Sequence, residues 1–235
     1  MTAYGPHHLA AAVAAICPDV QARIGQQAAR PEERHLWWEL SACVLSSQVP
    51  YSLAIAAADA IDEGQLLLTR DNDTDRLTQR LTKVLSAPLL IEGRKRMYRF
   101  PVARARHLAA TRAVVNKKAC SLQALLESFE DAALARAWFV RHAPGLGPKQ
   151  ASMFLRNAGV SYDLAVLDRH VLKYMSHLGI YERPAISIAG LAEYRQHEDT
   201  LRGHADAMNC PVGILDWAIW IVMRVARRET EKLSV

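Results

Sequence analysis

The residue best placed for nucleophilic chemistry in this sequence is Lys149, in the first turn of an expected helix. Pro148 begins that helix, because its fixed φ and missing N–H suit the first helical position. A lysine cation there faces the positive end of the helix dipole, which costs a few tenths to about 1 kcal/mol. The same position favours the neutral amine, which can attack carbon and form a Schiff base. The alternative explanation is a lysine that binds a phosphate.

The second candidate is Asp168, further along the chain and just before another expected helix. Its structural explanation is an N-cap, since Asp is favoured immediately before a helix. The apolar run 164–167 leads into it and predicts an interior position, where a carboxylate without a partner would be costly. A nearby Lys149 ammonium would supply that partner. The pair therefore predicts a nucleophile and a carboxylate that accepts its proton and stabilises a cationic sugar transition state.

Lys149 follows a tight turn formed by Pro144, Gly145, Leu146 and Gly147. The two glycines allow a sharp turn that presents backbone N–H groups, and with the helix N-terminus these groups form a phosphate site. An ordinary corner between two helices is the simpler alternative. The complete pattern, which continues through Ala151 to Leu155, resembles the helix–hairpin–helix, a clamp for the DNA backbone, over about residues 134–158.

The elements that must position these residues are predicted to be helical, because apolar residues recur at helical spacing and β-branched runs are few. Residues 89–100 are expected to be irregular and strongly basic. The fold class is therefore all-α. One expected helix covers about 7–29, and others begin at Pro31, at Pro50, after the acidic turn 71–74, at Pro101, after Ser121, at Asp131, at Pro148 and at Arg169. A further helix is expected at about 187–200, and a final apolar helix carries Leu215 to Met223 after a loop at 209–213.

Composition limits what such a protein can do. The 235 residues include 51% hydrophobic and 23% charged residues, mean hydropathy is −0.04 and the net charge is +5. This is an ordinary globular composition, long enough for one large domain or two small lobes, with a weak preference for a polyanionic partner. The four cysteines show no C-x-x-C spacing, which predicts reduced thiols and no cysteine metal site. We expect a cytoplasmic, nucleoid-associated protein without a membrane segment.

The motifs P-G-L-G-P-K at 144–149 and V-L-D-R-H-V at 166–171 together resemble the helix–hairpin–helix/Gly-Pro-Asp superfamily of DNA glycosylases. Lysine marks the bifunctional members, which are both N-glycosylases and abasic-site (AP) lyases. The phrases R-F-x-x-x-x-A-R-H-L at 99–108 and F-L-R-N-A-G at 154–159 look most like the archaeal-type 8-oxoguanine glycosylases. The resemblance implies a two-lobed helical fold with residues 1–235 forming one catalytic unit.

The resemblance also implies a mechanism of base-excision repair. Lys149 would attack C1′ of the damaged nucleotide while Asp168 assists, 8-oxoguanine would leave, and the Schiff base would drive β-elimination of the 3′ phosphate. The expected reaction uses no metal or redox cofactor, although the resemblance leaves open a monovalent cation held by hairpin carbonyls and a DNA phosphate. The expected partner is double-stranded DNA containing a damaged base, bound by a monomer. Because the base must leave the stack, Gln48, in a phrase similar to the family's wedge (C-V-L-S-S-Q at 43–48), would fill the gap. Its alternative is a polar residue at a helix C-terminus.

Further candidates contact the base and the backbone. Asp216 is expected to accept from a guanine edge, and Trp217 or Trp220 to stack on the flipped base. Core packing at i, i+3 spacing is the alternative for the tryptophans. The basic run from Arg94 to Arg106, with Arg94 and Arg96 as its named candidates, is expected to follow DNA phosphates, a solvated loop being the alternative. The hairpin glycines Gly145 and Gly147 are also expected to bind the DNA backbone.

Two departures from related enzymes bear on the target base. The iron–sulfur cysteines of the endonuclease III branch are missing, which argues against that branch. Archaeal-type enzymes typically end in a lysine that serves the base pocket, whereas Lys232 is followed by three further residues here. Two alternative functions stay open: a glycosylase of the same fold for another modified base, and a non-catalytic helix–hairpin–helix module that binds DNA.

Overall fold

The computed structural model describes residues 4–25, 31–182, 188 and 190–233. The chain divides into two compact units. The first unit combines Met1–Ala29 with Ser161–Val235, and the second is the continuous segment Arg30–Val160. Helices predominate in both units, as the helical spacing of apolar residues predicts, and the all-α fold class is confirmed.

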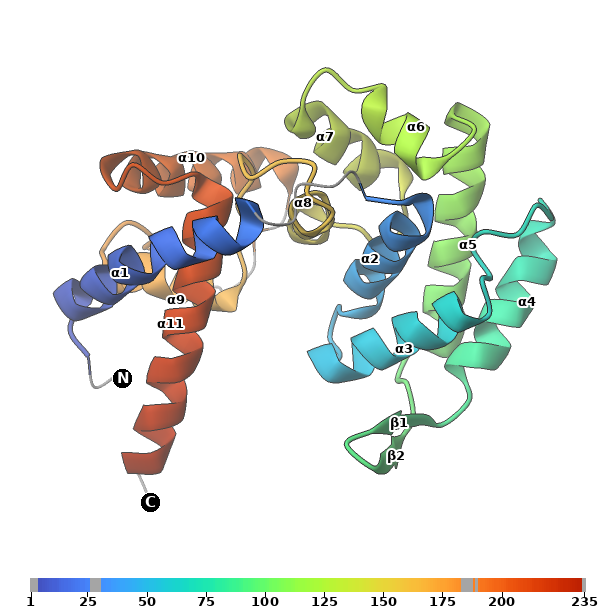
Figure 1. Ribbon diagram of the computed structural model, residues 1–235, viewed down its shortest axis with the longest axis horizontal. Coiled ribbons are helices and arrows are strands. Elements are labelled where there is room, and N and C mark those ends of the chain that lie inside the picture. The colour runs from blue at the N-terminus through green and yellow to red at the C-terminus, as the bar shows by residue number, and fades with distance from the viewer. Residues whose placement is uncertain (1–3, 26–30, 183–187, 189, 234–235) are drawn as a thin grey trace. The chain divides into compact units, whose positions relative to one another are not determined.

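The first unit is built from helices of both chain ends. Its elements are α1 (Pro6–Gly25), α9 (Arg169–His177), α10 (Leu191–Ala207) and α11 (Val212–Leu233). Helix α1 packs along α11 (Figure 1), and Leu9 and Val13 of α1 share one apolar core with Ala218 and Ile219 of α11. No single described helix is long and apolar enough to cross a membrane, and only the bent pair α10 and α11 passes that test by length and composition.

The second unit holds the remaining elements. Helix α2 packs on α3 and α8, α4 packs on α5, and α7 packs on α8. The bounds are α2 (Glu33–Leu45), α3 (Tyr51–Glu63), α4 (Thr74–Leu85), β1 (Leu89–Ile91), β2 (Arg94–Arg96), α5 (Pro101–Lys118), α6 (Leu122–Glu127), α7 (Ala132–His142) and α8 (Pro148–Asn157).

Four predicted helix starts are confirmed by their side-chain caps. Asp73 caps α4, and Ser121 accepts the Ala124 N–H at 3.0 Å at the start of α6. Asp131 accepts the Leu134 N–H at 2.7 Å in α7, and Asp168 caps α9. Each oxygen satisfies an N–H that has no partner within its helix.

Other predicted helix limits are displaced. Helix α2 begins at Glu33 rather than Pro31, and Pro50 is the N-cap of α3 rather than its first residue. Helix α10 begins at Leu191, after its N-cap Gly190, and continues to Ala207, past the expected end at about residue 200. Residue 187, where its start is expected, lies outside the described residues. The expected end of the first helix, after Gly25, lies outside the described residues.

The prediction that residues 89–100 are irregular is wrong for their first part. Strands β1 and β2 pair antiparallel, with Leu90 opposite Lys95 and Ile91 opposite Arg94. The connecting residues Glu92 and Gly93 have φ of 49° and 76°, the left-handed pair that closes a two-residue hairpin. In Figure 1 this hairpin extends from the helices of the second unit, and the side chains of Arg94 and Arg96 are exposed.

Candidate active site

The helix–hairpin–helix consists of α7, a short turn and α8, all within the second unit. The rings of Phe139 and Phe154 meet edge to face with centroids 5.2 Å apart, which joins the two helices through their apolar faces. A buried hydrogen bond from Arg136 to the Ser152 hydroxyl, 3.1 Å long, joins them again. The hairpin is therefore held rigidly by its own helices.

The turn between these helices needs glycine at one of the two expected positions. Gly145 has a φ of 87°, which side-chain-bearing residues rarely adopt. Gly147 is extended, with φ −78° and ψ 177°, and serves as the N-cap of α8. The expectation that both glycines supply conformational freedom is thus wrong for Gly147. Between them, Leu146 is buried and its N–H donates to the Ala143 carbonyl at 3.2 Å, which fixes the turn.

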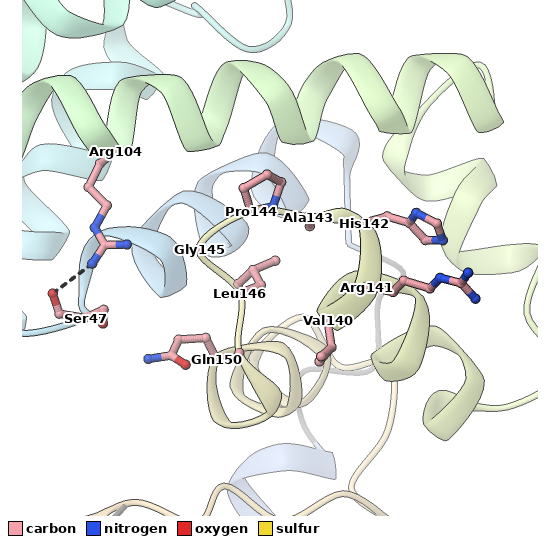
Figure 2. Close-up of a pocket in the computed structure, with 11 residues that line it drawn as sticks. Ser47, Arg104, Val140, Arg141, His142, Ala143, Pro144, Gly145, Leu146 and Gln150 are labelled. Atoms are coloured by element: carbon pink, nitrogen blue, oxygen red, sulfur yellow. Dashed lines mark hydrogen bonds between the residues drawn. The ribbon is translucent and has the colours of Figure 1, made fainter. Parts of the chain in front are cut away.

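A pocket of about 450 Å³ opens against this turn. Figure 2 shows Arg104 of α5 and Gln150 of α8 directed toward one side of it, while Arg141 and His142 point to the other side. Arg104 donates to the Ser47 carbonyl at 3.4 Å, and one of its nitrogens lies 3.3 Å from Nδ1 of His107. The glycine turn that precedes α8 and the guanidinium of Arg104 thus border one cavity, an arrangement suited to a phosphate.

Lys149 lies in the first turn of α8, as the sequence predicts, and is half-buried. Its Nζ is 3.8 Å from the Sδ of Met153, one turn further along the helix. The charge of Lys149 also acts on Cys43 of α2. Burial raises the pKa of the Cys43 thiol, and the positive charge of Lys149 partly offsets that rise. The end of α8 is joined to α2 by a 3.2 Å hydrogen bond from Asn157 to Glu39. Burial raises the pKa of Glu39.

Asp168 belongs to the first unit, so the two predicted catalytic residues stand on different units. Its Oδ1 accepts the N–H groups of His170 and Val171 at 2.7 and 3.0 Å. The carboxylate therefore has hydrogen-bond partners in its own helix, and an ion pair with Lys149 is not needed to offset the cost of its burial. The N-cap explanation is confirmed, and it leaves a catalytic role of the same carboxylate open as a prediction.

The three residues expected in a base pocket all lie on α11. Asp216 is 1% exposed and accepts the Val166 N–H at 2.6 Å, which argues against the expected contact with a guanine edge. Trp217 packs partly against the core of the first unit. Trp220 is half-exposed, and the guanidinium of Arg224 lies 4.3 Å from its ring centroid. The tryptophans remain the candidates for stacking on a base.

The predicted wedge residue Gln48 follows α2 in an exposed turn and has a φ of 61°. A non-glycine residue in this conformation is strained, and such strain persists only where surrounding contacts hold it. Two contacts hold the preceding backbone: Arg104 bonds the Ser47 carbonyl, and the Tyr98 hydroxyl donates to the Leu45 carbonyl at 2.8 Å. Gln48 is therefore presented to solvent from a fixed turn.

Comparison with known proteins agrees with this geometry. The family model described as 8-oxoguanine DNA glycosylase (Ogg-HhH) matches residues 20–210, which include the hairpin, Lys149 and Asp168. The chain belongs to the 8-oxoguanine DNA glycosylase family. The superfamily and the archaeal-type resemblance predicted from the motifs are thereby confirmed.

Members of this glycosylase family are similar over most of the chain. The 8-oxoguanine DNA glycosylase/AP lyase of Sulfolobus acidocaldarius is 30% identical over 80% of this chain and 82% of its own length. That of a Thermotoga species is 31% identical over 86% of this chain and 84% of its own. The crystal structure of the Thermotoga maritima 8-oxoguanine DNA glycosylase superposes with a TM-score of 0.67 at 27% identity, covering 92% of this chain and 95% of that one.

For two residues beside the hairpin the sequence gives only a general indication: Arg104 falls within the basic run Arg94–Arg106 expected to follow DNA phosphates, and His107 receives no role. Arg104 and His107 lie one turn apart on α5 and border the hairpin, although the sequence alone indicates only a basic helix there. Burial, and secondarily the charge of Arg104, lowers the pKa of His107. His107 is part of the family phrase at 99–108, in which Arg104 occupies one of the unspecified positions, and only the fold shows that both residues approach Gly145.

Gly145→Ala should damage the hairpin of this glycosylase more than Gly147→Ala. A Cβ at 145 would stand 2.6 Å from Nδ1 of His107, and the left-handed backbone costs a residue with a side chain about 1–2 kcal/mol. A Cβ at 147 would meet only the flexible end of Gln150, at 3.4 Å. Thermal unfolding and DNA titration of both variants check this. Equal losses in the two variants would contradict it.

Proposed function

We propose that the chain is a bifunctional DNA N-glycosylase and AP lyase of base-excision repair that removes 8-oxoguanine from duplex DNA. The observation that carries the proposal is Lys149 in the first turn of α8, behind a hairpin that aligns with the 8-oxoguanine DNA glycosylase family. The similar proteins of Sulfolobus and Thermotoga bear the name 8-oxoguanine DNA glycosylase/AP lyase.

In the proposed reaction, the neutral amine of Lys149 attacks C1′ of the damaged nucleotide. The bond between C1′ and the base breaks, and the base leaves with a proton. The sugar ring then opens to a Schiff base with the lysine, and loss of a C2′ proton expels the 3′ phosphate by β-elimination. Water finally hydrolyses the imine and returns the free lysine. Asp168 accepts the proton released by the amine and offsets the positive charge that develops on the sugar.

The remaining residues bind and expose the nucleotide. The N–H groups at the start of α8 hold a backbone phosphate, and Arg94 and Arg96 hold others further along the duplex. Gln48 enters the gap that the extruded base leaves, and Trp217 or Trp220 stacks on that base. The enzyme acts as a monomer on DNA of the nucleoid, and needs neither metal nor redox cofactor for these steps.

Borohydride trapping on duplexes with single lesions tests the proposal, because borohydride reduces the Schiff base to a stable amine. A covalent adduct is expected with 8-oxoguanine and none with undamaged guanine. Adduct formation only with a different damaged base would show a glycosylase of another specificity. Tight binding without an adduct on any lesion would leave a non-catalytic DNA-binding module and end the proposal.

Replacing both Arg94 and Arg96 with alanine should reduce the salt dependence of DNA binding. Each phosphate that an arginine neutralises contributes about 0.9 to the slope of log K against log salt, so removal of both arginines should lower the slope by about 1.8. The matched control is the double alanine variant of Lys117 and Lys118, an exposed basic pair at the end of α5. Fluorescence titrations at several salt concentrations measure both slopes. An unchanged slope in the Arg94 and Arg96 variant would remove β2 from the DNA footprint.

A further inference from the structure

The segment that leads into Asp168 bonds its backbone to buried side chains instead of to a neighbouring strand. The Ala165 N–H donates to Glu198 at 2.7 Å, and the Val166 N–H donates to Asp216 at 2.6 Å. The Leu167 N–H donates to the Tyr194 hydroxyl at 2.8 Å. Three successive donors thus find acceptors on α10 and α11.

The same segment is fixed at both ends. The Asp168 N–H donates to the Val166 carbonyl at 2.8 Å, and the Tyr194 hydroxyl donates to the Ala165 carbonyl at 2.8 Å. Every N–H from 165 to 168 is therefore bonded. Upstream, Gly213 at the start of α11 donates to the Tyr162 carbonyl at 2.8 Å. A Cβ on Gly213 would come within 2.9 Å of the Leu164 carbonyl, so helix and segment are as close as glycine permits.

The chemical nature of these acceptors is costly for a purely structural purpose. Glu198 is 2% exposed and Asp216 is 1% exposed, and Asp216 stands among apolar residues of α11. Burying a carboxylate carries a large desolvation penalty that a hydroxyl or an amide would avoid. A carboxylate gives a shorter and stronger bond to an N–H in return. Two buried carboxylates thus accept from successive N–H groups immediately before Asp168 and restrict the position of that backbone.

We propose that Asp216, Glu198 and Tyr194 are positioning residues that fix Asp168 for its part in catalysis. This inference rests on the proposed function, and it assigns Asp216 to the backbone of 165–168 instead of to the base. The side chains act through the segment: its N–H groups set the place of the Asp168 backbone, and the start of α9 orients its carboxylate.

Asp216→Ala removes the acceptor of the Val166 N–H and tests the inference directly. Displacement of a catalytic group by about 1 Å can cost on the order of a hundredfold in rate. We therefore expect the single-turnover rate of 8-oxoguanine excision to fall between about tenfold and a hundredfold, with DNA affinity within about twofold of wild type. Asp216→Asn retains an oxygen acceptor and should recover most of the rate. Tyr194→Phe, which loses two bonds to the segment, should resemble Asp216→Ala.

Tyr174→Phe is the matched control, because it removes another hydrogen bond in the same unit, 3.0 Å long, between Tyr174 and His204. It should lower the thermal unfolding temperature without lowering the excision rate. A rate loss in Tyr174→Phe equal to that in Tyr194→Phe would overturn the inference, since any weakening of the unit would then suffice.

A double variant separates positioning from general destabilisation. If Asp216 acts through Asp168, Asp216→Ala should cost little further rate once Asp168→Asn is present, because coupled residues are not additive. Full additivity would overturn the inference, as would a wild-type rate in Asp216→Ala.

Amide hydrogen exchange provides a readout independent of activity: exchange at 165–168 should quicken in Asp216→Ala and stay slow in Tyr174→Phe. An inactive wild-type enzyme would instead refute the proposed function, and exchange would still decide whether Asp216 holds the segment.

Discussion

Lys149→Gln is expected to abolish the borohydride adduct and to lower single-turnover excision by about 10³-fold or more. Glutamine keeps a polar side chain of similar reach in the first turn of α8 but has no amine that can attack carbon. Because the substitution removes a cation that faces the positive end of the α8 dipole, the helix should not be destabilised. Gel analysis of trapped complexes and quenched single-turnover kinetics measure the two effects.

The control for this variant is Lys83→Gln, which removes an exposed lysine from α4 of the same unit. It should form the adduct at the wild-type rate. The DNA affinity of Lys149→Gln should fall at most by the amount expected for the loss of one contact to a DNA phosphate. An adduct that persists in Lys149→Gln would show that another amine is the nucleophile. Loss of binding together with loss of chemistry would favour the simpler role of Lys149 as a phosphate ligand.

Asp168→Asn is expected to lower the rate of base excision by about 10²–10⁴-fold while leaving the fold intact. Asparagine caps helices about as well as aspartate, so its side-chain oxygen can keep the bonds to the N–H groups of His170 and Val171. The substitution therefore removes the charge and the proton acceptor but retains the cap. Single-turnover excision and thermal unfolding, measured on the same preparation, separate these two roles.

Asp131→Asn supplies the matched control, because Asp131 caps α7 through a 2.7 Å bond to the Leu134 N–H and is exposed. Both variants should unfold within a few degrees of wild type, and only Asp168→Asn should lose activity. If the two variants were equally active, Asp168 would be an N-cap alone, and the proton acceptor would have to be sought elsewhere.

Local chemistry explains why much of the fold can be predicted. The caps at Asp73, Ser121, Asp131 and Asp168 depend on a short polar side chain next to its own helix, which is visible in the sequence. The β-hairpin escapes prediction because three-residue strands show too little alternation to detect. The available signal is Gly93 between an apolar run and a basic run, which suits a turn with positive φ.

Site residues can be predicted from the sequence where they belong to a motif. They cannot be predicted where their contacts depend on how distant segments pack together. Lys149 and Gly145 are evident from their spacing, and the structure places Lys149 in the first turn of α8 and Gly145 at a positive φ. The predicted contact of Asp216 with the base depends only on an acid near tryptophans, which suits a guanine edge. Its burial against the Val166 N–H depends on how α11 meets a segment 50 residues away in the chain, and no local pattern indicates that contact.

The division of the chain has a consequence for the order in which the enzyme is assembled. The unit that bears Lys149 is one uninterrupted stretch, so all its internal contacts are available once Val160 has been synthesised. The unit that bears Asp168 joins α1 to α11, and its core includes Met223 and Ala226, close to the end of the described chain. Helix α1 is synthesised first, but it can pack on α11 only after almost the entire polypeptide has been synthesised. A nascent chain thus carries Lys149 long before it has the completed core that supports Asp168.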